Sequence, residues 1–225
     1  QTTGGNAIDL LCLQELKLPD DKYPLTILSD AGYHSLFSGQ KTYNGVAILI
    51  RKDCLWQNVN STIKQIPGFT DPQQRVISTT LANTSTQIRI ICAYFPNGYA
   101  PATEKFLYKI TWLNALYNWL KQEIIEYPRL ALLGDFNIAP KDSDVHNPAE
   151  WVGHNLVSSE ERVAFQNLES LGLHDAFRLF PQKEAQFSWW DYRQGAFRRN
   201  AGMRIDHILL SNKLAQACQN CLIDE

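Results

Sequence analysis

The sequence lacks any apolar run that could cross a membrane, because its apolar stretches fall short of the ~18 residues that a spanning helix needs. Residues 1–11 also lack the basic start and the apolar core of a secretory signal peptide. We therefore expect a protein without a membrane partner.

Cysteine is scarce, and its five occurrences do not form a disulfide framework. Cys12 and Cys92 lie inside apolar runs, which indicates buried strand positions. Cys218 and Cys221 form a C-x-x-C pair. Because no second pair lies nearby, a zinc or redox site is disfavoured. An odd number of largely buried thiols is typical of a reducing compartment. We expect a cytoplasmic protein.

A strong charge of one sign is also missing, as are several common catalytic motifs. The chain carries 21 Lys and Arg against 23 Asp and Glu, a formal net charge of -2. A dedicated nucleic-acid binder is often basic, so any DNA binding here must depend on a local patch.

The sequence contains no G-x-x-x-x-G-K-[ST] phosphate loop, no G-x-S-x-G elbow and no H-x-x-x-H zinc pattern. The absence of these motifs disfavours nucleotide-driven and acyl-enzyme chemistry, and it leaves metal-assisted hydrolysis or binding as the expected function.

Apolar residues are abundant: 44% of the 225 residues are hydrophobic and 11% are aromatic. A chain of this size buries roughly 70–75% of its unfolded surface. The sequence shows no internal repeat, low-complexity tract or linker. We expect one domain over residues 1–225.

Short apolar runs between turn residues predict strands, and a long segment with apolar residues three and four apart predicts an amphipathic helix. The predicted strands are residues 8–13, 33–37, 45–50, 75–81, 87–94, 130–133 and 205–210. The predicted helices are residues 103–126, residues 158–171, which begin with a capping box at Ser158 and Glu161, and residues 212–218. This alternation favours mixed sheets covered by helices.

Acidic and amide side chains stand at the ends of three of these strands. Glu15 follows the first strand, Asp135 and Asn137 follow residues 130–133, and Asp206 lies near the start of the last strand. A buried carboxylate is costly unless it is paired, hydrogen-bonded or bound to a metal. One such residue could equally cap a turn, but four favour a functional cluster. Glu15 offers the hard oxygen ligand that Mg²⁺ prefers.

Seven blocks of the sequence resemble exodeoxyribonuclease III and occur in that family's order. They are residues 13–17, 43–49, 93–98, 133–140, 172–178, 187–193 and 204–211. The G-D-x-N pattern in the fourth block marks only the wider endonuclease/exonuclease/phosphatase superfamily. The FSWWDYR and RIDHILLS patterns in the last two blocks are more specific. The chain therefore resembles the bacterial exodeoxyribonuclease III branch of abasic-site endonucleases.

The resemblance implies an α/β fold, a four-layered sandwich of two mixed β-sheets flanked by helices, as in DNase I-like proteins. It also implies a DNA-repair nuclease that requires Mg²⁺, for which Mn²⁺ can substitute. Such an enzyme hydrolyses phosphodiesters 5′ to abasic sites and degrades duplex DNA in the 3′→5′ direction. Its partners would be double-stranded DNA with abasic sites or 3′ ends, and we expect it to be a bacterial monomer.

Individual roles also follow from the resemblance. Glu15 matches the family's metal-binding glutamate, and Asp135 matches the aspartate that activates the attacking water. Asn137, Tyr94 and Asn97 match residues that contact the phosphate. Asp206 matches the aspartate that orients a catalytic histidine, and Trp189 matches an aromatic residue at the pocket for a baseless sugar. Tyr94 and Asn137 are neutral donors that suit the developing charge of a phosphodiester under attack.

Several further side chains are candidates for DNA contact. Lys17 and Tyr43 lie in loops that follow strand ends, where they could reach the DNA backbone. Arg193 and Arg204 belong to a basic cluster beside Trp189, and such clusters commonly contact phosphates. A run of charges can equally be a solvated face.

Two departures from the family concern the chain ends. The family's first strand carries an asparagine that should lie ahead of Gln1, and its final block, with the catalytic histidine, should follow Glu225. His207 is a poor substitute for that histidine, because it adjoins Asp206 and neighbours on a strand face opposite sides. We expect a domain truncated at both ends, weak or inactive as a catalyst, from an active full-length protein.

Two other functions stay open. The first is a different phosphoesterase of the superfamily, acting on inositol phosphates or sphingomyelin, which would not need Trp189 beside an arginine cluster. The second is a non-catalytic module that binds DNA ends.

Overall fold

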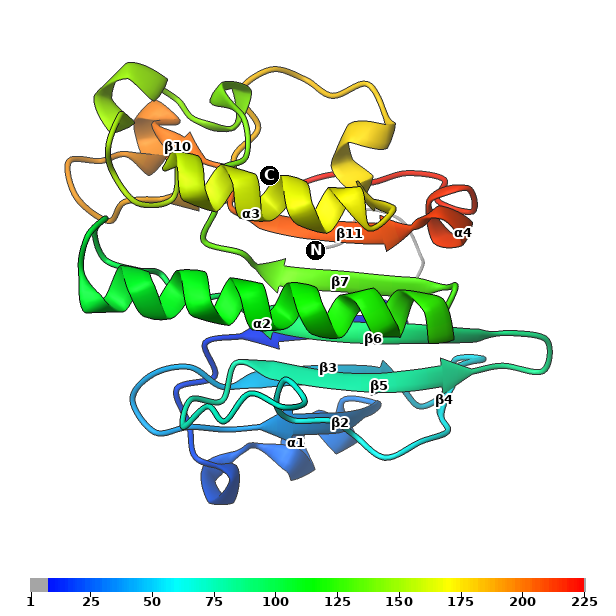
Figure 1. Ribbon diagram of the computed structural model, residues 1–225. Coiled ribbons are helices and arrows are strands. Elements are labelled where there is room, and N and C mark those ends of the chain that lie inside the picture. Colours follow the sequence, from blue (N-terminus) through cyan, green and yellow to red (C-terminus); the bar gives the residue numbers. More distant parts are fainter. Residues whose placement is uncertain (1–7, 225) are drawn as a thin grey trace.

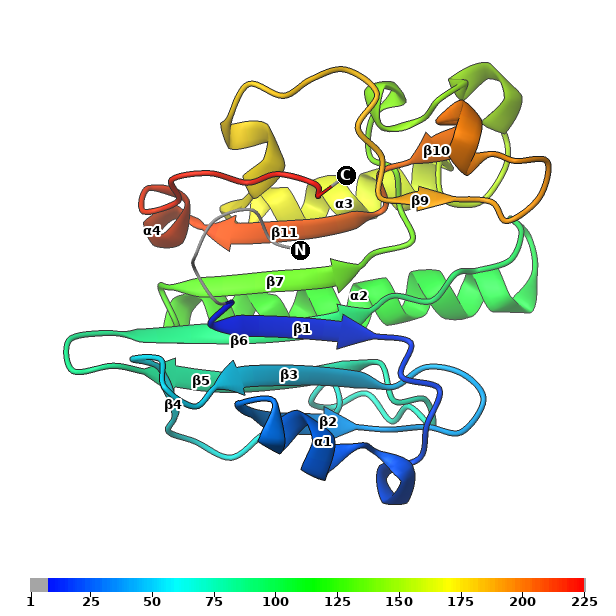
Figure 2. The same ribbon diagram turned by 180° about the vertical axis from the view of Figure 1, so that it is seen from behind.

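The computed structural model describes residues 8–224 and shows two β-sheets packed face to face, with helices on the outer faces (Figure 1; Figure 2). The expectations about the chain ends fall outside the described residues. Two apolar faces that pack together exclude water from the space between the sheets, which is the main driving force for this arrangement.

The larger sheet has the strand order β4-β5-β6-β7-β11-β8. Its strands are β4 (Gln57–Asn58), β5 (Val76–Ala82), β6 (Gln87–Tyr94), β7 (Leu130–Asp135), β8 (Leu173–Asp175) and β11 (Asp206–Ser211). β5 and β6 form the predicted hairpin. β6 and β7 run parallel, because the chain returns between them through a long crossover helix. The remaining neighbours are antiparallel, so this sheet is mixed, as predicted.

The smaller sheet has the order β1-β3-β2 in the part of the chain that the structure describes. Its strands are β1 (Leu10–Gln14), β2 (Tyr33–Ser38) and β3 (Val46–Arg51), and both pairings are antiparallel. Ile48 and Ile50 of β3 point toward the larger sheet, whereas Ala47 and Leu49 face the opposite side. β3 is apolar on both faces because each face is covered.

Helices form the two outer layers. α2 (Glu104–Glu126) and α3 (Ser159–Ser170) cover the larger sheet, and α1 (Leu25–Asp30) lies over the smaller one (Figure 1). The Thr103 hydroxyl accepts a hydrogen bond from the Phe106 N–H at the start of α2. α3 begins with the predicted capping box, in which Ser158 and Glu161 satisfy each other's free backbone donors. The four-layered sandwich is therefore confirmed.

Several short elements are absent from the sequence prediction because they are too short to show a period. α4 (Asn212–Ala215) is also shorter than the predicted helix over residues 212–218. The additional elements are α1, β4, β8, the hairpin of β9 (Trp189–Trp190) with β10 (Gly202–Met203), and the 3-10 helices Asp20–Lys22, Asp142–Asp144, Pro148–Trp151, Ala176–Leu179 and Phe197–Arg199. Within residues 8–224, every helix is too short or too polar to cross a bilayer.

His207 of β11 lies on the helix-covered side of the larger sheet. Its ring packs against Phe136 and Phe165, and its Nε2 lies 2.8 Å from the Ile138 carbonyl oxygen. Burial lowers the pKa of His207 to about 4. The ring is therefore neutral in the folded protein at neutral pH, and it belongs to the core.

The buried His207 should make stability depend on pH. The unfolded histidine has a pKa of about 6.5. Between that value and the folded pKa of about 4, the unfolded chain binds a proton that the folded chain does not. The contribution of His207 to the free energy of unfolding should therefore fall by on the order of 3 kcal/mol as the pH drops through this window, relative to a variant without the histidine, and this contribution should be constant above the window. Urea unfolding from pH 7 to pH 4 measures the effect.

His207→Phe should flatten that dependence, because the neutral ring cannot take up a proton in either state. His34→Gln, at an exposed position of β2, serves as the control and should leave the dependence in place. An equally steep pH dependence in His207→Phe would contradict the assignment.

Candidate active site

The sequence-predicted site residues come together at one edge of the sandwich, where strands of both sheets end or begin. The parallel strands β6 and β7 end there and the antiparallel β11 starts there, so Tyr94, Asp135 and Asp206 lie side by side in the sheet register. β1 of the smaller sheet points to the same edge (Figure 2). Glu15, directly after β1, therefore faces the larger sheet.

A hydrogen bond joins the two sheets at this edge. The Tyr94 hydroxyl donates to Glu15 Oε1 over 2.6 Å, and Lys17 Nζ lies 3.0 Å from Glu15 Oε2. Glu15 and Lys17 both have a positive φ, which bends the chain sharply after β1 and brings Glu15 to Tyr94 and Lys17 to Glu15. Partial burial favours the neutral form of Glu15, but the hydrogen bonds from Tyr94 and Lys17 outweigh it and hold its pKa below the usual value. Glu15 thus presents an ionised carboxylate at this edge.

Asp135 and Asp206 face each other across β7 and β11. Burial raises the pKa of Asp135 to about 8, and repulsion by the neighbouring Asp206 adds to the increase. The Asn137 N–H donates to Asp135 Oδ1 over 2.8 Å, which fixes the carboxyl group in place. The pKa of Asp206 is also raised, because protein atoms replace part of its hydration shell. The metal-free pair therefore retains a proton near neutral pH.

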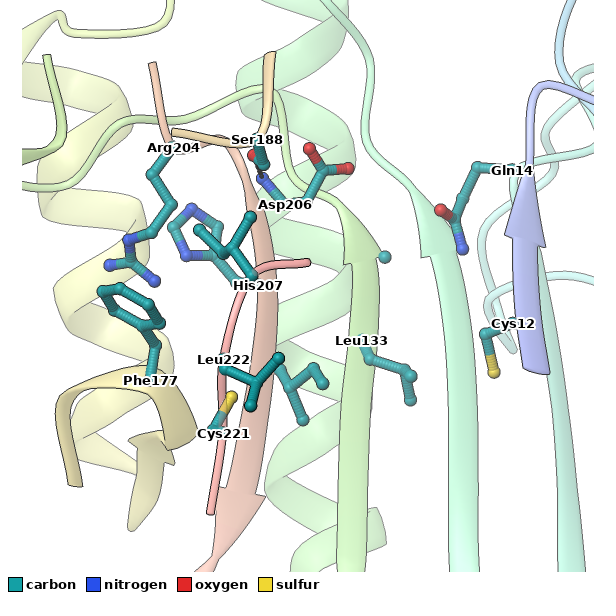
Figure 3. Close-up of a pocket in the computed structure, with 13 residues that line it drawn as sticks. Cys12, Gln14, Leu133, Phe177, Ser188, Arg204, Asp206, His207, Cys221 and Leu222 are labelled. Carbon is teal, nitrogen blue, oxygen red and sulfur yellow. Dashed lines mark hydrogen bonds between the residues drawn. The ribbon is translucent and has the colours of Figure 1, made fainter. Parts of the chain in front are cut away.

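Asp206 borders an open space between the sheets. Figure 3 shows Asp206, Ser188 and Gln14 at one end of a hollow of about 260 Å³ that extends along β1, β7 and β11 toward Cys12 and Leu222. The Asp206 N–H donates to Ser188 Oγ over 3.1 Å, which attaches the start of β11 to the segment before β9. The Asp206 carboxyl group thus stays accessible from this hollow.

Two asparagines hold each other beside the carboxylates. Asn137 has a left-handed backbone, with φ 50°, and its Nδ2 donates to the Phe95 carbonyl oxygen over 3.0 Å. Asn97 Nδ2 donates to Asn137 Oδ1 over 3.0 Å, and Asn97 Oδ1 accepts from Asn155 Nδ2 over the same distance. The two amides are therefore fixed before any substrate arrives.

Gly134 explains why the carboxylate-bearing strand can sit so close to β6. A Cβ atom at this position would lie 2.0 Å from the Ala93 carbonyl oxygen, and the residue has φ 142°. Only glycine fits this close approach. The G-D pair of the sequence motif is thus a packing requirement that places Asp135.

The donor set suits Mg²⁺. No three His, Cys, Asp or Glu side chains among residues 8–224 form a complete protein cage for a metal ion. Mg²⁺ does not need such a cage, since it keeps several waters and takes one or two carboxylates plus substrate phosphate oxygens. The ionised Glu15, with Asp135 nearby in a cluster of mutually repelling carboxylates, fits this requirement. A cation would relieve their repulsion.

The candidate DNA-contacting residues Lys17, Tyr43, Trp189 and Arg193 remain available on loops around the edge. Tyr43 is 70% exposed, and the side chain of Arg193 is 88% exposed. Trp189 lines a hollow of about 230 Å³ together with Arg193, while one side of its ring packs against the protein. Tyr192 is close enough to Lys17 to influence its pKa, so the loop after β9 faces the loop after β1.

Arg204 corrects the sequence analysis. It was expected to contact DNA, but its side chain is 1% exposed. Its Nε donates to Asp144 Oδ1 over 2.7 Å, and its terminal nitrogens donate to both oxygens of Asp175. A guanidinium in a bidentate pair inside the protein cannot turn out to bind a phosphate. Arg204 instead joins three segments of the fold.

Two residues of the site were missed. Arg75 is buried beneath Tyr94, with its guanidinium 4.9 Å from the ring centre and its Nη1 donating to the Tyr94 carbonyl oxygen. Lys109 lies fully buried behind Asn97 and Asn137. One signal could have found Lys109: it falls three residues after Phe106, on the apolar face of the predicted helix, where a lysine needs a partner.

The comparisons with known proteins agree with this geometry. Residues 3–225 match the model of the endonuclease/exonuclease/phosphatase family. The chain is 36% identical to exodeoxyribonuclease III of Haemophilus influenzae over 222 residues, which cover 93% of this chain and 80% of that protein.

Solved structures show the same likeness. The 3′ phosphatase NExo from Neisseria, bound to a product DNA hairpin, matches with a TM-score of 0.86 and 43% identity over 94% of this chain and 79% of that one. An AP endonuclease from Archaeoglobus fulgidus matches with a TM-score of 0.87 and 32% identity over 96% of this chain and 81% of that one.

Asp206→Asn should lower the pKa of Asp135, because it removes the nearest like charge. We expect the titration midpoint of Asp135 to move down by on the order of one pH unit in metal-free protein. Carbon-13 NMR of the aspartate carboxyl groups measures it directly. Asp53→Asn, at an exposed position, should leave the Asp135 midpoint unchanged. An unchanged midpoint in Asp206→Asn would show that the two carboxyl groups do not interact.

Proposed function

The chain belongs to the endonuclease/exonuclease/phosphatase family, and from this premise we propose that it cuts duplex DNA 5′ to abasic sites and removes nucleotides from 3′ ends. Its relatives include exodeoxyribonuclease III and an AP endonuclease, so it is a metal-dependent DNA-repair nuclease of the exonuclease III type. The observation that carries the proposal is the convergence of Glu15, Tyr94 and Asp135 at one loop-lined edge.

Asp135 is the proposed general base for the attacking water molecule. In-line attack on a phosphodiester requires a water molecule that loses a proton as the new P–O bond forms. The Asp135 carboxyl group is held by the Asn137 N–H, and a cation at Glu15 would displace the proton that the metal-free pair retains, so the carboxylate could then accept the proton of the water. Asp206 beside it supports the raised basicity by repulsion.

Neutral donors and a metal stabilise the developing charge. Tyr94 and the amides of Asn97 and Asn137 are positioned to donate to phosphate oxygens, and being neutral they bind the product weakly enough to release it. Glu15 would hold Mg²⁺, or Mn²⁺ in its place, and the ion would supply charge neutralisation at the phosphate and at the leaving oxygen.

Substrate contact is proposed for the surrounding loops. The half-buried Trp189 offers an apolar wall to a sugar that lacks its base, whereas an intact base would clash with it. Lys17, Tyr43 and Arg193 are exposed at the same edge and suit contacts to the DNA backbone. The Neisseria relative described as a 3′ phosphatase bound to a DNA hairpin supports processing of 3′ ends.

We further propose that residues 1–225 act as one domain, as a monomer, in the bacterial cytoplasm. One family model spans residues 3–225, which supports the single domain. All five cysteines lie within the described residues and are free thiols, which suits a reducing compartment. The relatives from Haemophilus and Neisseria support a bacterial source.

Asp135→Asn should abolish most of the activity. We expect magnesium-dependent nicking of a duplex with one abasic site, and release of nucleotides from a recessed 3′ end, to fall by about 10²–10⁴-fold, the range of general-base catalysis. Denaturing gels with end-labelled DNA measure both reactions. Asp21→Asn, at an exposed surface position, is the matched control. Full activity of Asp135→Asn would remove Asp135 from the mechanism.

Glu15→Gln separates the metal site from the general base. The amide can still accept the Tyr94 hydrogen bond but binds Mg²⁺ poorly, so the Mg²⁺ concentration for half-maximal nicking should rise more than roughly tenfold. Excess Mg²⁺ should restore the rate of Glu15→Gln but not that of Asp135→Asn. An unchanged magnesium requirement would contradict the role of Glu15.

The same assays distinguish the two alternatives. Hydrolysis of inositol phosphates or sphingomyelin without cleavage of abasic DNA would favour a different phosphoesterase. Binding of duplex ends without cleavage would favour a non-catalytic module.

A further inference from the structure

A buried ammonium group lies beneath the candidate site, and the chemistry described above does not use it. Lys109 stands in the first half of α2, and its side chain is fully buried. Its Nζ forms an ion pair with Glu161, at the start of α3. A buried ammonium is expensive, and it persists only where its donors are all used.

The other acceptors of Lys109 identify its place in the site. Nζ donates to the Asn137 carbonyl oxygen over 2.7 Å and to the Asn97 carbonyl oxygen over 3.3 Å. These are the two asparagines whose side-chain amides bond to each other at 3.0 Å beside Asp135. One cation therefore fixes the backbone of both residues.

The loop after β6 is shaped around the lysine stem. Gly98 has φ 86°, and a Cβ atom there would lie 2.9 Å from Lys109 Cδ. Asn137 likewise has a left-handed backbone, which is uncommon outside glycine and directs its carbonyl oxygen toward Nζ. Both loops adopt unusual conformations that bring them onto the same ammonium group.

We propose that Lys109 is a positioning residue for phosphodiester hydrolysis: it holds the backbones of Asn97 and Asn137 so that their amides face the scissile phosphate. The proposal rests on the proposed function for its kinetic consequence, but the positioning itself can be observed without activity. Glu161 holds the ammonium, and it accepts further hydrogen bonds from the backbone N–H groups of Leu156 and Ser158.

The expected consequence falls on the chemical step. Displacement of a catalytic donor by about 1 Å can cost about 10²-fold in rate. Binding of the DNA depends mainly on the exposed Lys17, Tyr43 and Arg193, none of which is a hydrogen-bond partner of Lys109. Lys109→Met should therefore lower kcat for nicking of abasic DNA by about 100-fold and change KM by less than about threefold.

A second variant is needed because Lys109→Met leaves Glu161 buried without its partner, which can disturb folding. Lys109→Met combined with Glu161→Gln removes both charges, and the one amide oxygen of the glutamine can still accept the Ser158 hydrogen bonds of the capping box. Lys121→Met, on the exposed side of the same helix, is the matched control and should behave as the wild type. Circular dichroism and thermal melting establish that each variant is folded.

The readout that is independent of activity is nitrogen-15 NMR of the side-chain amides of Asn97 and Asn137. Replacement of the ammonium should shift or broaden both pairs of amide signals, and Lys121→Met should leave them unchanged. A lysine with a purely structural role would alter the melting temperature and leave these amide signals and kcat as they are.

The outcomes separate the two proposals. Loss of kcat with displaced amide signals in the folded double variant supports the positioning role. Unchanged amide signals, or a kcat within about threefold of the wild type, would overturn it. If the full-length wild-type protein does not cut DNA at all, the proposed function fails, and the amide signals alone decide whether Lys109 positions the asparagines.

Discussion

Apolar contact between the two sheets is the constraint on which the site depends. Ile48 and Ile50 of the smaller sheet pack with Ile77 and Cys92 of the larger one, and these side chains are almost completely buried. Their burial holds the two sheets against each other, because separation would expose this apolar surface to water. The hydrogen bond between Tyr94 and Glu15 joins the same two sheets at the active edge.

The chemistry at that edge arises from carboxyl groups gathered where water is partly excluded. Asp135 and Asp206 are brought together by strand pairing, and their repulsion in a half-buried setting makes Asp135 a stronger base than a free aspartate. For Glu15 the effect of burial is outweighed, because the hydrogen bonds that it accepts from Tyr94 and Lys17 lower its pKa and keep it ionised. Similar carboxyl groups thus suit different roles, one as the proposed base and one as the proposed metal ligand, because their surroundings differ.

Rigidity behind the site is supplied by buried charges. The Lys109–Glu161 pair supports the asparagine loops, and the pairs of Arg204 with Asp144 and Asp175 fasten the segment before β11. Neither pair is a strong source of stability, because the removal of ions from water offsets most of the attraction. Their value lies in geometry, since hydrogen bonds to a fixed charge define the positions of the loops they join.

The sequence by itself determined the local elements and the chemical types present. Periodicity gave the long helix, strand ends gave Glu15, Asp135 and Asp206, and blocks of motifs gave the family, because each of these signals lies in residues close along the chain. Only the tertiary structure decided which strand ends meet, that Arg204 is buried, and which carbonyl groups Lys109 reaches. Those facts depend on packing between segments far apart in sequence, and a local pattern carries no information about the partner that burial will select.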